Sequence, residues 1–156
     1  MFDDIIVTGV TEAEHDRNVE EVLRKARKFN IKFNPKKLQY KQEKVKYLGL
    51  IFASDGICPD EERVRAITEI ETPTCVRELQ RFLGAVNFIN KFIPSFSKVT
   101  SNLRILLKKT TPWKWTKLQQ EAFDTLKKLV STAPTLKTFN PKQPIQIQCD
   151  ASKEGM

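Results

Sequence analysis

Apolar residues recur every three or four positions over much of the chain, and this spacing predicts helices. The first predicted helix covers residues 12–29. Thr11 and Glu14 match a capping box, in which a hydroxyl and a carboxylate each accept a free backbone N–H. The apolar stripe of this helix is Val19, Val22, Leu23, Ala26 and Phe29. The pattern is typical of an amphipathic helix that packs on a sheet.

Short runs rich in β-branched and aromatic residues lie on both sides of this helix and predict strands. The predicted strands are residues 5–8, 31–33, 38–41 and 45–53. Residues 42–44 are the expected turn before the last strand, and Asp55-Gly56 closes the set. Strand, helix, strand and hairpin in this order predict an α+β module.

Three further helices follow, with little strand signal between them. The first is expected to begin near Pro59 and to stop at Thr72-Pro73, where Thr74 caps the second; the third follows Pro94. Their apolar stripes are Val64, Ala66, Ile67 and Ile70, then Leu79, Phe82, Leu83, Val86 and Ile89, then Val99, Leu103, Leu106 and Leu107. These stripes predict a small helical bundle.

The C-terminal part of the pattern predicts one more helix and one more strand. Thr116 and Gln119 form a second capping box, and the helix that they open ends at Ala133-Pro134. Its apolar stripe is Ala122, Phe123, Leu126, Leu129 and Val130. Residues 138–144 are polar and bounded by prolines, which favours a linker. Residues 144–150 alternate like a half-buried strand that ends at Asp150.

Composition narrows the class of protein. The 156 residues are 40% hydrophobic and 29% charged, as in a globular protein, and no apolar run or leader indicates membrane insertion or secretion. We therefore expect a cytoplasmic or nuclear protein. Cys58, Cys75 and Cys149 are odd in number and widely spaced, which indicates neither a disulfide framework nor a zinc site. His15 lacks a sequence partner that would make it a ligand or a base.

The charge balance points to a polyanionic partner. Lys and Arg number 27 against 19 Asp and Glu, giving a formal net charge of +8. Basic residues gather late in the chain at Lys91, Lys98, Arg104, Lys108, Lys109, Lys114 and Lys117, and residues 79–120 contain no acid. Such a stretch can follow a phosphate backbone, because neutralised phosphates release counterions. A solvated lysine-rich surface is the alternative reading of the same charge.

Trp113 and Trp115 interrupt this basic stretch. Indole rings can stack on nucleobases, or they can anchor a hydrophobic core. Large aromatic residues at the start of a capped helix favour the core. We therefore expect the lysines to bind and the tryptophans to pack.

Asp3 and Asp4 stand directly before the first predicted strand. Two aspartates at the tip of a hairpin can hold Mg²⁺, which prefers carboxylate oxygens and leaves room for substrate phosphates. A turn with two solvated carboxylates is the alternative, and the dipeptide alone favours it.

Several spaced motifs, taken together, change that balance. They are Phe2-Asp3-Asp4-Ile5-Ile6-Val7, Lys46-Tyr47-Leu48-Gly49, Ile57-Cys58-Pro59-Asp60, Leu79-Gln80-Arg81-Phe82-Leu83-Gly84, Phe92-Ile93-Pro94-Ser95-Phe96-Ser97, Trp115-Thr116 with Gln120-Glu121-Ala122-Phe123, and Asp150-Ala151-Ser152. The first is similar to the Tyr-x-Asp-Asp motif of reverse transcriptases. The ordered set resembles the polyprotein of gypsy-type long-terminal-repeat retrotransposons over essentially the whole chain.

The resemblance implies a domain order and an activity. Residues 1–57 would be the C-terminal half of a reverse transcriptase palm, an antiparallel sheet with a helix, and residues 58–110 a thumb-like helical bundle. Residues 111–137 would be a connection helix region, and residues 138–156 a linker and the first strand of a ribonuclease H-like domain. The ancestral activity would be RNA-directed DNA synthesis with ribonuclease H cleavage.

The resemblance also implies roles for individual residues. Asp3 and Asp4 match the catalytic, metal-binding pair of the polymerase, and Asp150 matches the first metal-binding aspartate of ribonuclease H, with Mg²⁺ as the ion of the complete enzyme. The stretch Tyr47-Leu48-Gly49 matches a hairpin that grips the end of the primer, where a glycine lets a nucleic-acid backbone come close. If the family resemblance is set aside, a glycine at position 49 within a predicted strand indicates a bulge. The implied partners are an RNA/DNA primer-template duplex and the missing polyprotein segments.

The same comparison implies that the chain alone is inactive. The upstream aspartate of the polymerase site and the later carboxylates of the ribonuclease site are not in this sequence, and Met1 stands where the family has tyrosine. We expect weak Mg²⁺ binding and exposed apolar surface on the first module. Two alternatives are a non-enzymatic basic module that binds nucleic acid or a protein, and an inert remnant of an element.

Overall fold

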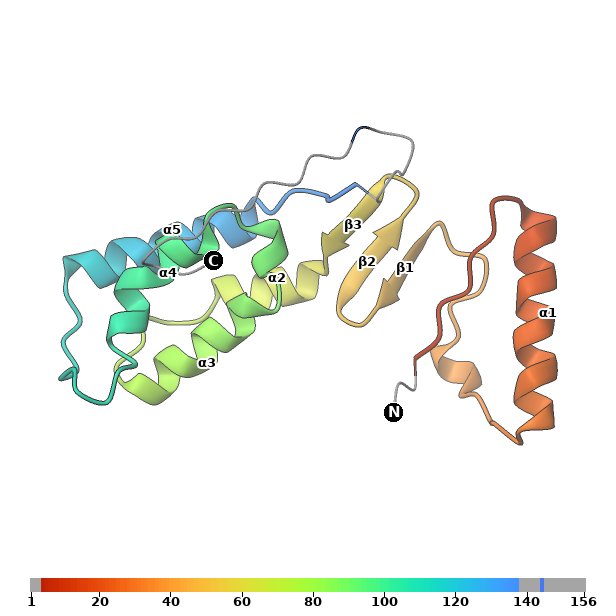
Figure 1. Ribbon diagram of the computed structural model, residues 1–156, viewed down its shortest axis with the longest axis horizontal. Helices are drawn as coiled ribbons and strands as arrows, with labels where there is room; N and C mark the ends of the chain where they lie inside the picture. Colours follow the sequence, from red (N-terminus) through yellow and green to blue (C-terminus); the bar gives the residue numbers. More distant parts are fainter. Residues whose placement is uncertain (1–3, 138–143, 145–156) are drawn as a thin grey trace.

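The computed structural model describes residues 4–137 and residue 144. A helical bundle lies at one end of the molecule, a small sheet in the middle and a single long helix at the other end (Figure 1). The helices are α1 Glu12–Lys28, η1 Pro35–Lys37, α2 Glu61–Thr68, α3 Val76–Asn87, η2 Asn90–Phe92, α4 Phe96–Ile105 and α5 Lys117–Ser131. Strands β1 Lys44–Tyr47, β2 Leu50–Ala53 and β3 Gly56–Pro59 form an antiparallel sheet in the order β1-β2-β3. The predicted α+β class is confirmed.

The long helix α1 begins and ends within one residue of its predicted bounds. The Thr11 hydroxyl accepts the backbone N–H of Glu14 at 3.2 Å, as the capping box requires. The Glu14 carboxylate reaches one residue further back than expected and accepts the N–H of Val10 at 3.0 Å. The helix start therefore depends on local sequence, which is why its pattern located it correctly.

Three predicted strands are wrong. Residues 5–8, 31–33 and 38–41 have no regular strand structure. A strand exists only where a partner satisfies its backbone N–H and C=O groups, and the described residues supply no ladder to these segments. The chain forms the short helix η1 between them instead, where the Asn34 side chain accepts the N–H of Lys36 at 3.0 Å.

The predicted strand 45–53 is a hairpin rather than a single strand. Leu48 and Gly49, with φ of 48° and 70°, form the turn between β1 and β2. Positive φ at both central residues is the geometry of a type I′ turn, whose twist matches that of paired strands. The turn expected at residues 42–44 is thus misplaced, because the apolar Leu48 makes the strand pattern continuous through the real turn.

The start of the helical bundle also differs from the prediction. Pro59 ends β3, and Asp60 caps α2 by accepting the N–H of Glu62 at 3.3 Å. Helix α2 ends at Thr68, well before Thr72-Pro73. Cys75, not Thr74, is the N-cap of α3; the N–H and hydroxyl of Thr74 donate to the Glu78 carboxylate at 2.7 and 2.9 Å.

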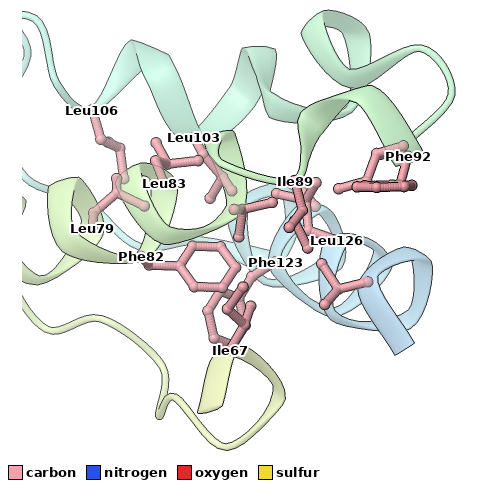
Figure 2. Packing of buried hydrophobic residues seen from close by; sticks show 14 of the residues in the cluster. Ile67, Leu79, Phe82, Leu83, Ile89, Phe92, Leu103, Leu106, Phe123 and Leu126 are labelled. Atoms are coloured by element: carbon pink, nitrogen blue, oxygen red, sulfur yellow. The ribbon is translucent and has the colours of Figure 1, made fainter. Parts of the chain in front are cut away.

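Helices α2, α3, α4 and α5 share one hydrophobic core. Figure 2 shows Ile67, Phe82 and Phe123 pointing toward one another from three different helices. The rings of Phe82 and Phe123 have centroids 4.6 Å apart. Burying each large apolar side chain contributes about 1.5–3 kcal/mol. Since α5 packs against both α2 and α4, it belongs to the same core as the three helices predicted to form the bundle.

The end of the bundle returns to the sheet. The N–H of Ile57 on β3 donates to the carbonyl oxygen of Leu136 at 2.8 Å, and the N–H of Leu136 donates to the Ile57 carbonyl at 2.8 Å. Leu136 follows α5, so the chain leaves the bundle beside the strand through which it entered.

Residues 4–43 bury little apolar surface. Ala26 is the one buried residue in this segment. The exposed large apolar residues here are Ile5, Val10, Leu23, Phe29, Ile31, Phe33, Leu38 and Tyr40. The predicted exposed apolar surface of the first module is therefore confirmed. Within the described ranges, no helix has both the length and the apolar character needed to cross a membrane.

Candidate nucleic-acid interface

The turn between β1 and β2 presents an unusual backbone to solvent. Leu48 is 48% exposed and has a positive φ, which costs an L-residue about 1–2 kcal/mol. Gly49 follows with φ of 70°, and a Cβ at this position would lie 3.2 Å from the Arg63 guanidinium. Gly49 is therefore a turn residue and not a bulge. Its missing side chain makes room for the Arg63 guanidinium and the Phe88 ring, which lie beside the place where a Cβ would be.

Tyr47 connects this hairpin to the N-terminal segment. Its hydroxyl donates to the backbone carbonyl of Asp4 at 3.4 Å, and its ring packs edge-on against Phe52. The structure thus brings the predicted grip residue Tyr47 next to the predicted metal ligand Asp4. Asp3 and Asp150, the other two predicted ligands, lie outside the described residues.

The carboxylates in the described ranges do not form a Mg²⁺ site. Asp4 is exposed. Over residues 4–137 and 144, no group of three or more His, Cys, Asp or Glu side chains is placed to hold a metal ion. A hard divalent cation needs several oxygen ligands, so Asp4 by itself does not fit this role. The assignment of Asp3, Asp4 and Asp150 as metal ligands stays a prediction.

Lys46 fixes the hairpin to the start of α2. Its Nζ lies 2.5 Å from Oδ2 of Asp60 and 2.6 Å from Oε2 of Glu62. Both hydrogen bonds raise the pKa of Lys46, and the one accepted by Asp60 has the larger effect. The Lys46 ammonium in turn lowers the pKa of the Asp60 carboxyl against the opposing effect of burial. Asp60 therefore caps α2 and binds β1 at the same time.

The basic residues all lie on the surface. Lys91, Lys98, Arg104, Lys108, Lys109, Lys114 and Lys117 are exposed, as is Arg81. Residues 79–120 thus hold eight basic residues and no acid, so this stretch accounts for the whole formal net charge of +8. The connection between α4 and α5, which carries three of these lysines, lies at the end of the bundle away from the sheet (Figure 1).

Arg104 is oriented by its own helix. Its Nε donates to the Thr100 hydroxyl at 3.1 Å, and its guanidinium lies 5.7 Å from the centroid of the Phe96 ring. These contacts restrict the side chain while its charge stays in water. An arginine held in this way loses less conformational freedom on binding a phosphate.

Trp113 and Trp115 pack rather than project. The Trp115 indole N–H donates to Oε1 of Gln120 at 2.8 Å, and its ring meets Phe123 edge-on at 5.9 Å. Trp113 stacks on Trp115 with centroids 5.8 Å apart. Both are half-buried against the bundle core. The prediction that the tryptophans pack is confirmed.

Gly84 is a feature whose meaning the sequence pattern did not reveal. It lies in the middle of α3 and is exposed, and apart from the backbone of its own helix and its two chain neighbours no heavy atom lies within 4 Å of the place where its Cβ would be. A glycine inside a helix costs about 1 kcal/mol relative to alanine, and here no packing requires it. An open helix face of this kind admits close approach by another molecule. A glycine within a strong helical stripe is the signal that could have identified it.

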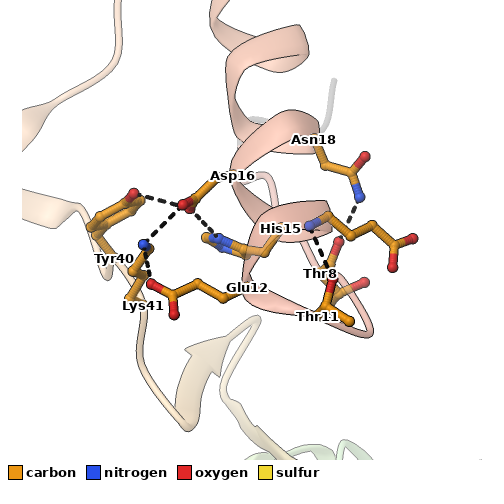
Figure 3. A network of polar contacts seen from close by, with 9 residues as sticks. Thr8, Thr11, Glu12, His15, Asp16, Asn18, Tyr40 and Lys41 are labelled. Atoms are coloured by element: carbon orange, nitrogen blue, oxygen red, sulfur yellow. Dashed lines mark hydrogen bonds and ion pairs between the residues drawn. The ribbon is translucent and has the colours of Figure 1, made fainter.

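A second polar cluster joins α1 to the segment before β1 (Figure 3). Asp16 accepts from Lys41 Nζ at 3.0 Å and from the Tyr40 hydroxyl at 3.3 Å, and its Oδ1 lies 3.2 Å from Nδ1 of His15. Lys41 also pairs with Glu12. The Lys41 and His15 hydrogen bonds lower the pKa of Asp16. His15 is therefore a satisfied histidine whose partner is the neighbouring Asp16, and the cluster holds two segments together.

Two family models match the chain. The model for reverse transcriptase (RNA-dependent DNA polymerase) matches residues 2–52, and the model for the RNase H-like domain found in reverse transcriptase matches residues 115–156. The Tf2-3 and Tf2-4 transposon polyproteins of Schizosaccharomyces pombe are each 35% identical over 151 residues. The chain corresponds to a segment of a retrotransposon reverse transcriptase/ribonuclease H region. These matches cover 97% of the chain and 11% of each relative, so the segment spans about a tenth of the curated relatives' length.

Solved structures share the fold of this reverse transcriptase segment. The foamy viral protease-reverse transcriptase in complex with RNA/DNA hybrid matches with a TM-score of 0.75 and 25% identity, over 88% of this chain and 19% of that chain. The foamy viral protease-reverse transcriptase dRH in complex with ds DNA matches with a TM-score of 0.75 and 24% identity, over 86% of this chain and 24% of that chain. The reverse transcriptase segment therefore shares the fold of part of the foamy viral protease-reverse transcriptase.

Proposed function

We propose that this reverse transcriptase segment binds a nucleic-acid duplex through the basic residues of positions 79–120. The observation that carries the proposal is that this stretch has eight exposed basic residues and no acidic one, so it accounts for the whole formal net charge. Neutralising phosphates releases condensed counterions and drives binding. The foamy viral relatives, which were solved with RNA/DNA hybrid and with double-stranded DNA, support a duplex as the ligand.

Two uncharged features complete the proposed surface. The Leu48-Gly49 turn would contact the end of the primer, and the open face of α3 at Gly84 would admit the duplex closely. Both offer shape and backbone access rather than groups aimed at base edges. Binding should therefore depend on duplex geometry and show little preference for sequence.

We further propose the finer assignment implied by the motifs. The segment would come from a gypsy-type element whose activity is RNA-directed DNA synthesis with ribonuclease H cleavage. Residues 1–57 would be half of the palm, 58–110 the thumb, 111–137 the connection and 138–156 the start of ribonuclease H. The motifs that support this order are those matched by the two family models at either end of the chain. Asp3, Asp4 and Asp150 are the proposed Mg²⁺ ligands, with further carboxylates from the polyprotein.

The test is binding of the purified chain to a labelled RNA–DNA primer-template, measured by fluorescence anisotropy over a series of salt concentrations. Changing Lys108 and Lys109 together to Glu should weaken binding by about tenfold or more, because two phosphate contacts become repulsions. The matched control changes Lys36 and Lys37 to Glu. These are also adjacent, exposed lysines, but they lie in η1, outside the acid-free stretch.

The comparison between the two double variants decides the proposal. We expect affinity to fall steeply with salt and the control to bind nearly as well as the wild type. Equal losses in both variants would show that net charge alone attracts the duplex. A wild type that fails to bind at low salt would overturn the proposal.

A further inference from the structure

Three elements meet at the side chain of Arg63. Arg63 is half-buried in the first turn of α2, and its guanidinium carbon lies 4.0 Å from the centroid of the Phe88 ring at the end of α3. A Cβ on Gly49 would lie 3.2 Å from both Nε and Nη2 of Arg63 and 3.4 Å from the Phe88 ring edge. The guanidinium is therefore in contact range of the turn on one side and of the ring on the other.

This contact falls on the strained part of the hairpin. Leu48 and Gly49 both have positive φ, and a residue such as leucine keeps that conformation only where its surroundings hold it. The pairing of Tyr47 with Leu50 holds the turn from the strand side. Arg63 meets it from the bundle side, together with the edge of the Phe88 ring.

A guanidinium suits this position better than an ammonium. It is planar and delocalised, so it can lie against an aromatic ring with one surface and leave its N–H edge beside a backbone. An aliphatic ammonium is a hydrated point charge and cannot fill the same flat space. The ion pair from Lys46 to Asp60 also joins the hairpin to the start of α2, but it does not involve the turn residues Leu48 and Gly49.

We propose that Arg63 is a positioning residue that fixes the Leu48-Gly49 turn against the end of α3. The turn and the open face of α3 at Gly84 then form one rigid surface, and a duplex meets both together. This inference rests on the proposed duplex binding, and it assigns Arg63 a role that involves no contact with nucleic acid. Arg63 therefore supports duplex binding by holding the turn in place, not by neutralising a phosphate.

The experiment compares Arg63→Ala and Arg63→Lys with Arg65→Ala. Arg65 is an exposed arginine on the same helix, so the control removes the same charge without touching the turn. Duplex affinity is measured over a salt series, and the amide signals and φ-sensitive couplings of Leu48 and Gly49 are followed by nuclear magnetic resonance. Arg63→Lys keeps the charge and the helix, so it remains informative if Arg63→Ala folds poorly.

We expect both Arg63 variants to bind the duplex about fivefold more weakly, as loss of a cation–π contact of ordinary strength would produce. The slope of log affinity against log salt should stay at the wild-type value, and the Leu48 and Gly49 signals should shift. Arg65→Ala should change none of these three quantities.

Several results would overturn the inference. Full binding by Arg63→Lys would mean that the turn does not need a guanidinium. A salt slope reduced by about one in Arg63→Ala would mean that Arg63 contacts a phosphate directly. Unchanged Leu48 and Gly49 signals in both variants would mean that it does not fix the turn. If the wild type binds no duplex, the proposed function fails, and the resonance signals still decide whether Arg63 holds the turn.

Discussion

The ammonium of Lys46 lies 2.5 Å from the carboxylate of Asp60, and the same carboxylate caps α2. One residue thus connects the middle of the molecule to the helical bundle. Asp60→Ala should destabilise the chain by about 1–2 kcal/mol, since it removes a helix cap as well as the partner of Lys46. Asp60→Asn keeps the cap and should lose less. Urea unfolding of both variants measures the two contributions. Equal stability of Asp60→Ala and Asp60→Asn would contradict a contribution from the cap, and equal stability of Asp60→Asn and the wild type would contradict one from Lys46.

The same pair predicts a pH dependence. The Lys46 hydrogen bond lowers the pKa of Asp60 in the folded state below its ordinary value near 4. A lowered folded-state pKa adds stability above the ordinary pKa, and this stability is lost as the pH falls through the lowered value. Stability should therefore decline on the acid side of pH 4. Asp60→Asn should flatten this decline when unfolding is measured from pH 6 down to pH 2, whereas an unchanged curve would exclude Asp60 as its source.

Phe123 tests whether α5 is part of the bundle's folding unit. Its ring is buried against Phe82 and Trp115, so Phe123→Ala should cost about 3–5 kcal/mol. Leu118 lies on the same helix and is 59% exposed, and Leu118→Ala should change stability by less than about 0.5 kcal/mol. Calorimetry and tryptophan fluorescence should report a single lowered transition for Phe123→Ala. A transition of α5 that is separate from the rest of the bundle would contradict the shared core.

The helix α1 should open far more easily than the bundle. It buries Ala26 and is otherwise held by surface polar contacts such as Lys41 with Asp16. A helix of 17 residues is marginal in water without tertiary packing. Amide hydrogen exchange should therefore be fast throughout α1 and slow in α3 and α5. Equal protection in all three helices would show that α1 is stabilised by contacts that this arrangement lacks.

Gly84→Ala should separate stability from binding. Nothing within 4 Å opposes a methyl group there, so the change should stabilise α3 by about 1 kcal/mol. The same methyl group should hinder the approach of a duplex and weaken its binding. Thermal unfolding and primer-template affinity should thus move in opposite directions. A variant that gains stability and keeps full affinity would remove Gly84 from the proposed surface.

The helices could be predicted from the sequence because their signals are local. Thr11, Thr116 and the apolar stripes determine where a helix starts and which side it buries, and the structure places both capping threonines at helix starts. Strands depend on a partner elsewhere in the chain, which is why the segments 5–8 and 31–33 have a strand-like sequence but no strand structure.

The candidate site could be predicted only in part, for the same reason. The charge of residues 79–120 is visible in the sequence, and so is the hairpin motif. The turn at Leu48-Gly49 was missed because a leucine in the left-handed region has no sequence signature. The contacts of Arg63 with Phe88 and with the turn join residues that are distant along the chain, and no spacing rule could reveal them.

The reciprocal hydrogen bonds between Ile57 and Leu136 bring the entry and the exit of the helical bundle to one place. Everything between these two residues is therefore a closed loop with adjoining ends. A unit whose ends adjoin in this way suits domain insertion and circular permutation, because a short linker can join the two ends.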